Sequence, residues 1–239
     1  MDTHVNRKAE TLDELVRSRR TVRAFRPDPV PRAELEAILE VARCAPSTFN
    51  TQPWLVYVLA GEAKHALSAA ILRAHAANAC PPFTPFPEKP PEDVAARQQE
   101  FGRLYYAALG IDRSDMAARG RQTARNFVFF DAPVGLIFTI DRALTQHSWL
   151  DYGLFLQTLM LAAHARGLAT CPQVSFVRYK SVIASELALD SQEIVVCGMA
   201  VGYADERAPV NDLGMPRESL AALARWAGFD ESRLSAATR

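Results

Sequence analysis

Three short stretches of the chain are rich in apolar, β-branched and aromatic residues, which predicts strands. They cover residues 54–59, 133–140 and 193–201. The first alternates along the chain, and the second reads as a strand buried on both faces. Because helical segments separate the three stretches, the chain predicts an α+β fold in which non-adjacent strands meet in one sheet.

Apolar residues recur at helical spacing through much of the remaining sequence. The predicted helices span residues 11–19, 31–42, 63–76, 91–109, 114–129, 149–166, 180–187 and 216–227. Pro31 suits the first turn of the second helix, where its missing N–H would be unpaired in any case. Gly167 suits the C′ position after the sixth helix. That sixth helix is apolar on nearly every side, so we expect it to be buried all round, in a core or between subunits.

Residues 80–91 hold six prolines and cannot form a regular element. Strand-like segments lie on both sides of this stretch, which indicates an excursion within one domain rather than a linker between two. We therefore expect residues 1–239 to form a single domain with its core at 11–229. Residues 80–125 are expected to form a variable lid that sets specificity.

The charge and cysteine content exclude several classes of protein. Lys plus Arg and Asp plus Glu both number 27, which is untypical of a nucleic-acid or membrane-surface binder and compatible with an oligomer. The first twelve residues lack an apolar signal-peptide core, and no run of about 18 apolar residues occurs. A cytoplasmic location is therefore expected. The cysteines are scattered without metal-ligand spacing, which predicts free thiols and no metal site: Cys44, Cys80, Cys171 and Cys197.

The sequence lacks the common motifs of catalytic side chains. It contains no G-x-G-x-x-G after a strand, no P-loop, no H-E-x-x-H and no G-x-S-x-G. The five histidines are dispersed, and His164 on an apolar helix is more typical of an interior residue than of a catalyst. If the protein is an enzyme, we expect a bound cofactor to carry the chemistry.

A basic string follows the first predicted helix. Its polar members are Arg19, Arg20, Thr21 and Arg23. Guanidinium groups give planar, permanently charged contacts to phosphate, and the hydroxyl adds a neutral donor. The interleaved Val22 and Phe25 indicate that the string is held against a core. A solvated basic surface is the alternative interpretation.

A polar loop lies between the second predicted helix and the first predicted strand. Its Asn50 and Gln52 carry amides that can donate and accept, as the N3, O2 and O4 edge of a flavin ring requires. Pro46 and Pro53 stiffen the loop and would hold these amides in place. The alternative is a polar turn without a ligand.

The two segments together resemble the FMN-dependent nitroreductase family. Residues 19–25 resemble its R-R-S-x-R phosphate motif, and residues 45–54 resemble its A-P-S-x-x-N-x-Q-P-W motif. Residues 151–172 resemble its central helix and following loop, and 196–203 its last strand. The resemblance spans about residues 12–229 and is greatest for the branch that includes 4-nitrobenzoate reductases. Thr21 stands where serine is commoner, but the hydroxyl is kept.

The resemblance implies a fold and a set of binding residues. The fold is a mixed central sheet surrounded by helices, in an intertwined homodimer with one FMN at each end of the subunit interface. The implied phosphate ligands are Arg19, Arg20, Thr21, Arg23 and Arg217. The implied flavin contacts, some from the partner subunit, are Pro46, Ser47, Asn50, Gln52 and Gln157, with the backbone of Pro172, Gln173, Val174 and Ser175.

The resemblance also implies a reaction in which no side chain acts as a nucleophile. NADH or NADPH would give a hydride to flavin N5 and leave, and a nitroaromatic acceptor would take its place in a ping-pong cycle. Nitroso and hydroxylamine products would follow from successive two-electron steps. The motifs leave open another FMN enzyme on the same scaffold, such as a flavin reductase, reductive dehalogenase or dehydrogenase. They also leave open a non-catalytic flavin-binding protein and a structural dimer without flavin.

Overall fold

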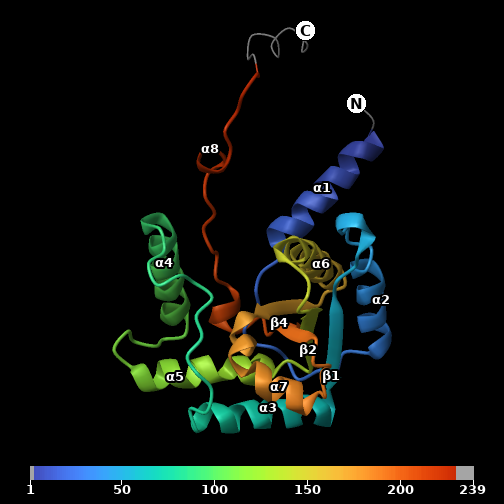
Figure 1. Cartoon of the computed structure of the whole chain (residues 1–239). Coiled ribbons are helices and arrows are strands. Elements are labelled where there is room, and N and C mark those ends of the chain that lie inside the picture. The colour runs from blue at the N-terminus through green and yellow to red at the C-terminus, as the bar shows by residue number, and fades with distance from the viewer. Residues whose placement is uncertain (1–2, 230–239) are drawn as a thin grey trace, which may run out of the picture.

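A four-stranded antiparallel sheet forms the centre of the computed structural model, which describes residues 3–229 (Figure 1). Its strands are β1 (Leu55–Ala60), β2 (Val134–Asp141), β3 (Ala169–Gln173) and β4 (Glu193–Gly202), and their order in the sheet is β1-β2-β4-β3. A parallel bridge between Thr21 and Thr170 places the segment after the first helix beside β3. The predicted α+β fold is confirmed. The outermost residues of the predicted domain, 1–2 and 230–239, lie outside the described part.

Helices cover both faces of the sheet. The α-helices are α1 (Thr3–Ser18), α2 (Arg32–Ala42), α3 (Gly61–Ala76), α4 (Glu92–Ala108), α5 (Met116–Ala124), α6 (Gln146–His164), α7 (Lys180–Glu186) and α8 (Leu220–Leu223). Short 3₁₀ helices are η1 (Thr48–Asn50), η2 (Arg125–Asp131), η3 (Val174–Tyr179) and η4 (Pro209–Asn211). Helices α2 and α6 lie on one face, and α3 and α7 lie on the other (Figure 1).

Each face of the sheet has its own core because side chains alternate along a strand. Leu136 and Phe138 of β2 pack with α2 and α6, whereas Ile137 between them packs with α3, η2 and η3. Two sheet glycines admit aromatic rings on that second face. A Cβ on Gly198 would lie 2.5 Å from the ring of Phe176, so glycine is required for η3 to press against the sheet.

The structure confirms the three predicted strands and adds a fourth. β3 is short and contains Pro172, which lacks a ladder donor, so its sequence reads as a loop. Gly167 has φ +73° and closes α6 as predicted, with the Leu168 amide donating to the Ala163 carbonyl at 3.0 Å.

Three helix predictions were wrong in extent. The predicted helix 216–227 is helical only over Leu220–Leu223, because its apolar side chains are exposed and have no core to pack against. The predicted helix 114–129 ends at Ala124, and η2 follows it with left-handed residues. The predicted helix 11–19 begins earlier, at Thr3. Helix α6 is not buried all round within one chain, since Leu150 is 67% exposed.

Residues 3–229 contain neither a membrane-spanning helix nor a cluster of metal-ligating side chains. None of the helices there has both the length and the apolarity to cross a membrane. The same residues contain no group of three or more histidine, cysteine and acidic side chains placed to hold a metal ion.

Candidate functional site

The basic string lies in an extended conformation against the sheet. The Val22 amide donates to the Thr170 carbonyl at 3.1 Å, and the Arg26 amide donates to the Tyr203 carbonyl at 2.9 Å. Val22 and Phe25 are buried in the core. The string is therefore held against the core, as its interleaved apolar residues predict.

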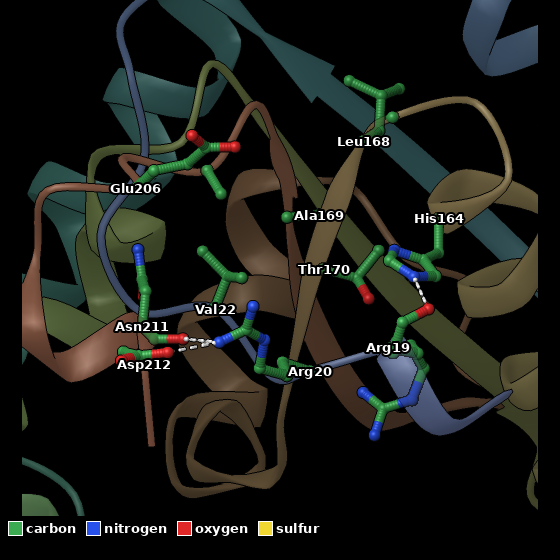
Figure 2. A pocket seen from close by; sticks show the side chains of 13 residues that line it. Arg19, Arg20, Val22, His164, Leu168, Ala169, Thr170, Glu206, Asn211 and Asp212 are labelled. Carbon is green, nitrogen blue, oxygen red and sulfur yellow. Dashed lines mark hydrogen bonds and ion pairs between the residues drawn. The ribbon is translucent and has the colours of Figure 1, made fainter. Parts of the chain in front are cut away.

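Arg19 and Arg20 line a cavity of about 560 Å³ between the string, the start of β3 and residues 204–212 (Figure 2). Arg20 forms an ion pair with Asp212, with 2.7 Å between Nη1 and Oδ1. At the other side of the cavity, His164 Nε2 lies 2.8 Å from Ser18 Oγ. Sequence reasoning treated His164 as an interior residue and missed its place here.

Positive charge accumulates around Arg19. Burial lowers the pKa of the Arg19 guanidinium, and the nearby Arg217 lowers it further. Burial also lowers the pKa of His164, with smaller contributions from Arg19 and Arg20. Like charges disfavour each other's charged forms, so a bound anion would relieve this arrangement. The charge of Arg217 thus reaches Arg19 although the two residues are far apart in sequence.

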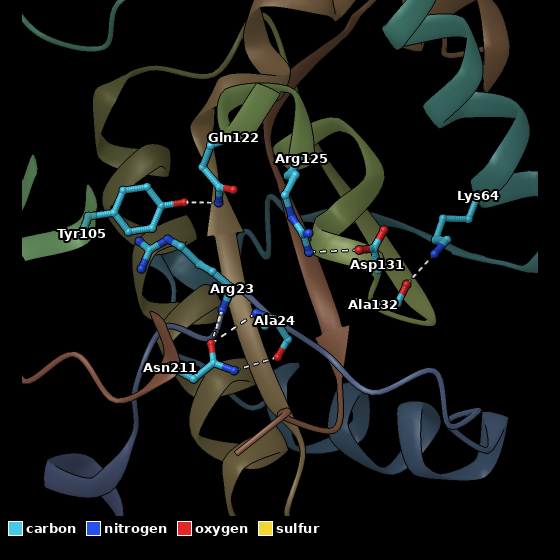
Figure 3. A network of polar contacts seen from close by, with 9 residues as sticks. All are labelled: Arg23, Ala24, Lys64, Tyr105, Gln122, Arg125, Asp131, Ala132 and Asn211. Carbon is cyan, nitrogen blue, oxygen red and sulfur yellow. Dashed lines mark hydrogen bonds and ion pairs between the residues drawn. The ribbon is translucent and has the colours of Figure 1, made fainter. Parts of the chain in front are cut away.

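Arg23 lies apart from this group. It lines a second cavity, of about 330 Å³, with Gln122 and Arg125 (Figure 3). Its guanidinium carbon lies 5.1 Å from the ring centroid of Tyr105 and 5.3 Å from that of Phe101, both on α4. Because extended residues rise about 3.3 Å each, the Arg23 backbone is about 13 Å from that of Arg19. The two arginines therefore point to different parts of any shared ligand.

Thr21 pairs with β3 between these two arginines, and the end of β3 and the start of η3 carry two unpartnered polar atoms. Gln173 is only 3% exposed, and its Nε2 donates to the Asn126 carbonyl at 2.7 Å. Gln173 Oε1 and Ser175 Oγ are buried without a hydrogen-bond partner. Buried polar atoms normally find partners, so these two indicate a place for a polar ligand. They lie in the predicted flavin-contact segment, whose other members are Pro172 and Val174.

The amide loop lies at the opposite end of α6. The Thr48 amide donates to Asp151 Oδ2 at 3.0 Å, and the Gln52 amide donates to Ser47 Oγ at 3.0 Å. Three residues of the loop have left-handed φ values: Phe49 (51°), Asn50 (58°) and Gln52 (46°). Such conformations are costly outside glycine and concentrate at functional sites.

A single chain does not bring the amide loop to the basic string. Asp151 and His164 are thirteen residues apart on α6, which corresponds to about 20 Å along the helix. Pro46, Asn50 and Gln52 are exposed at the first end, and Phe49 beside them is 99% exposed. Gln157 is exposed between the two ends and lines neither cavity.

The arrangement within one chain can hold an elongated ligand with an anionic group near Arg19 and Arg217. A polar ring edge would lie near Gln173 and Ser175, and the Arg23 guanidinium lies against the Phe101 and Tyr105 rings of α4. Residues 16–203 match the model of the nitroreductase family.

The chain belongs to the nitroreductase family. It is 51% identical over 221 residues to a 4-nitrobenzoate reductase of Pseudomonas putida, a match that covers 92% of this chain and 97% of that protein. It is 44% identical to a chloronitrobenzene nitroreductase of Comamonas testosteroni, over 87% of this chain and 93% of that protein.

Solved structures of nitroreductases share the whole fold. The FMN- and NADPH-dependent nitroreductase NfnB from Sphigopyxis sp. strain HMH matches with a TM-score of 0.88 and 37% identity, covering 91% of this chain and 99% of that chain. The FMN-dependent NfnB of Mycobacterium smegmatis, solved in complex with NADPH, matches with a TM-score of 0.87 and 35% identity, covering 92% and 99%.

Proposed function

We propose that this nitroreductase-family protein is an FMN-dependent NAD(P)H oxidoreductase that reduces nitroaromatic compounds. The observation that carries the proposal is the cavity that Arg19 and Arg20 line at the start of β3, followed along the chain by buried, unpartnered polar atoms at Gln173 and Ser175. The FMN- and NADPH-dependent NfnB structures and the nitroaromatic reductases among the relatives support it.

The phosphate of FMN would be held at the start of the basic string. Within residues 3–229, neither Arg19 nor Arg217 forms an ion pair with a carboxylate, so both charges could act on a phosphate. Arg20, in contrast, is already paired with Asp212. The Thr21 hydroxyl would add a donor. Arg23 would lie near the ring rather than the phosphate and would favour negative charge there.

The flavin ring would lie along residues 172–175. Gln173 and Ser175 would offer their unpartnered side-chain atoms, and the backbone of Pro172 and Val174 would line one face of the ring. FMN would supply the hydride chemistry, taking two electrons from NADH or NADPH at N5 and passing them to the acceptor in a ping-pong cycle. The protein would contribute stacking geometry and fixed charge.

A homodimer would complete each site. Exposed apolar side chains that are grouped on one element favour association, and here they occur on α1, on α6 and on the C-terminal segment, which leads away from the body (Figure 1). The exposed residues include Leu12, Val16, Trp149, Leu150, Leu154, Leu223, Trp226 and Phe229.

Two-fold symmetry explains why the loop and the string lie at opposite ends of α6. A two-fold axis across α6 would bring the loop of one copy to the string of the other. Pro46, Ser47, Asn50 and Gln52 would then reach the flavin from the partner subunit. Gln157 would lie on the α6 surface that the partner covers.

We also propose that residues 1–239 form one domain with a core at 11–229, in which residues 80–125 are a lid. Helix α4 of this segment places Phe101 and Tyr105 over Arg23, next to the expected position of the ring. The lid would therefore border the place where donor and acceptor bind in turn.

Anaerobic reduction of the FMN-loaded protein tests the proposed activity. NADH or NADPH should bleach the visible flavin band, and 4-nitrobenzoate added afterwards should restore it with consumption of the nitro compound. Bleaching without re-oxidation by any nitroarene would indicate another FMN enzyme. Bound flavin that neither nicotinamide reduces would contradict the oxidoreductase.

A further inference from the structure

The buried side chain of Asn211 connects the basic string to the segment that follows β4 (Figure 3). It is 8% exposed at the last position of η4. Its Oδ1 accepts hydrogen bonds from the amides of Arg23 (2.7 Å) and Ala24 (3.2 Å). Its Nδ2 donates to the carbonyls of Ala24 (2.7 Å) and Asp205 (2.9 Å). All the hydrogen-bonding capacity of the amide is therefore used.

These contacts hold Arg23 and Ala24, the part of the string whose amides do not bond to the sheet. On one side the Val22 amide bonds to Thr170, and on the other the Arg26 amide bonds to Tyr203. Between them, both backbone N–H groups of Arg23 and Ala24 end on Asn211. The Asn211 side chain therefore holds the backbone at Arg23, from which the guanidinium extends to the rings of α4.

The same turn also contacts another cation of the string. Asp212 pairs with Arg20 at 2.7 Å, and the Asn211 carbonyl accepts from Arg20 at 3.4 Å. Residues 211 and 212 thus contact both Arg20 and Arg23 of the string.

We propose that Asn211 is a positioning residue of the FMN site: it fixes the backbone at Arg23 and attaches the string to the segment at 205–211. This inference rests on the proposed function. Asparagine is required because the side chain must accept from two amides and donate to two carbonyls. An aspartate keeps the acceptor but places a buried negative charge against the carbonyls of Ala24 and Asp205.

The test compares Asn211→Ala and Asn211→Asp with Tyr152→Phe as a control. Tyr152 is also buried and donates to two backbone carbonyls, those of Leu55 and Thr139, outside the basic string. For each variant, urea unfolding of the apoprotein and FMN affinity by fluorescence titration are measured. We expect all three to lose stability, but only the Asn211 variants to lose FMN affinity, by about tenfold or more. Equal FMN affinity in folded Asn211 variants and parent would overturn the proposal.

Hydrogen exchange of the apoprotein gives a readout that needs no cofactor. The amides of Arg23 and Ala24 should exchange faster in Asn211→Ala, which removes their acceptor, than in the parent, whereas Tyr152→Phe should leave them unchanged. Unchanged protection of Arg23 and Ala24 would contradict the role assigned to Asn211.

A double-mutant cycle with Arg23→Ala distinguishes positioning from general support. If Asn211 acts through Arg23, Asn211→Ala should cost clearly less FMN affinity in the Arg23→Ala background than in the parent. Additive losses would show that the route through Arg23 is wrong. A parent protein that binds no FMN would instead refute the proposed function itself.

Discussion

At the scale of single residues, the charge on Arg19 has the clearest consequence. Burial, and to a smaller extent the charge of Arg217, lower the pKa of Arg19, so an anion bound beside its guanidinium would offset this cost. Arg19→Ala should weaken FMN binding by about 1.5–3 kcal/mol, roughly ten- to a hundredfold, because it removes a charge-assisted contact. Flavin fluorescence titration measures this loss.

The matched control for Arg19 is Arg32→Ala. Arg32 is exposed on α2 and pairs with Glu36, outside both cavities. Its replacement should leave FMN affinity unchanged. Equal affinity of the Arg19→Ala and Arg32→Ala proteins would remove Arg19 from the phosphate site.

His164 makes the stability of the apoprotein depend on pH. Its pKa is lowered by burial and by Arg19 and Arg20, so the folded state favours the neutral ring. The unfolded chain binds a proton near the ordinary pKa of about 6.5, and the folded chain does so only at lower pH. Stability should therefore be full above about pH 6.5 and fall as pH drops below it.

Substitution of His164 tests this linkage. His164→Gln should reduce the loss of stability between about pH 7.5 and 5.5, measured by urea unfolding at each pH. His75 also has a lowered pKa and remains in both proteins, so the comparison isolates His164. An identical pH dependence in parent and variant would show that His164 titrates alike in both states.

At the scale of elements, helix α4 offers two adjacent tyrosines with different neighbours. The Arg23 guanidinium carbon lies 5.1 Å from the Tyr105 ring, and that of Arg119 lies 4.2 Å from the Tyr106 ring. Cation–π contacts contribute about 0.5–2 kcal/mol. Tyr105→Leu should therefore weaken FMN binding roughly two- to thirtyfold by releasing Arg23, whereas Tyr106→Leu should not.

Tyr105→Phe refines the comparison, because it keeps the ring and loses only the hydroxyl that accepts from Gln122 at 2.7 Å. It should bind FMN nearly as well as the parent in the same titration. Equal losses in Tyr105→Leu and Tyr106→Leu would mean that α4 affects FMN binding only through its contribution to the stability of the fold.

The sequence predicts best those elements that are buried against other elements, because burial requires a run of apolar residues. Residues 134–141 and 193–202 are buried along most of their length, so their apolar runs identify them as strands. β3 cannot be predicted from the sequence because its five residues include a proline and show no such apolar run. It becomes a strand only by pairing with β4 in the folded chain. The last predicted helix fails for the converse reason, since its apolar spacing has no core within the chain.

Only the parts of the site that consist of short local motifs can be predicted from the sequence. Arg19, Thr21 and the loop at 46–52 stand out as short strings. The roles of Asn211 and His164 do not, because they depend on residues 204–212 and the end of α6 lying beside the string. The distance between Arg23 and Arg19 could not be predicted either, because it depends on the extended conformation of the string.

At the scale of the whole molecule, the distribution of surfaces links assembly to cofactor binding. The loop with Asn50 and Gln52 lies at one end of α6, the basic string lies near the other, and Leu150 is exposed on the helix between them. If two copies complete each site, a substitution on this surface should weaken FMN binding although it changes none of the residues that bind FMN. Leu150→Glu places a charge on that surface and should give a monomer with weakened FMN binding.

Sedimentation velocity of the FMN-loaded protein, recorded in both the protein band and the visible flavin band, tests the central claim most directly. The account predicts one yellow dimeric species with one FMN per subunit, and a largely colourless monomer for Leu150→Glu. A parent protein that stays colourless with excess FMN, or that carries full flavin as a monomer, would contradict it.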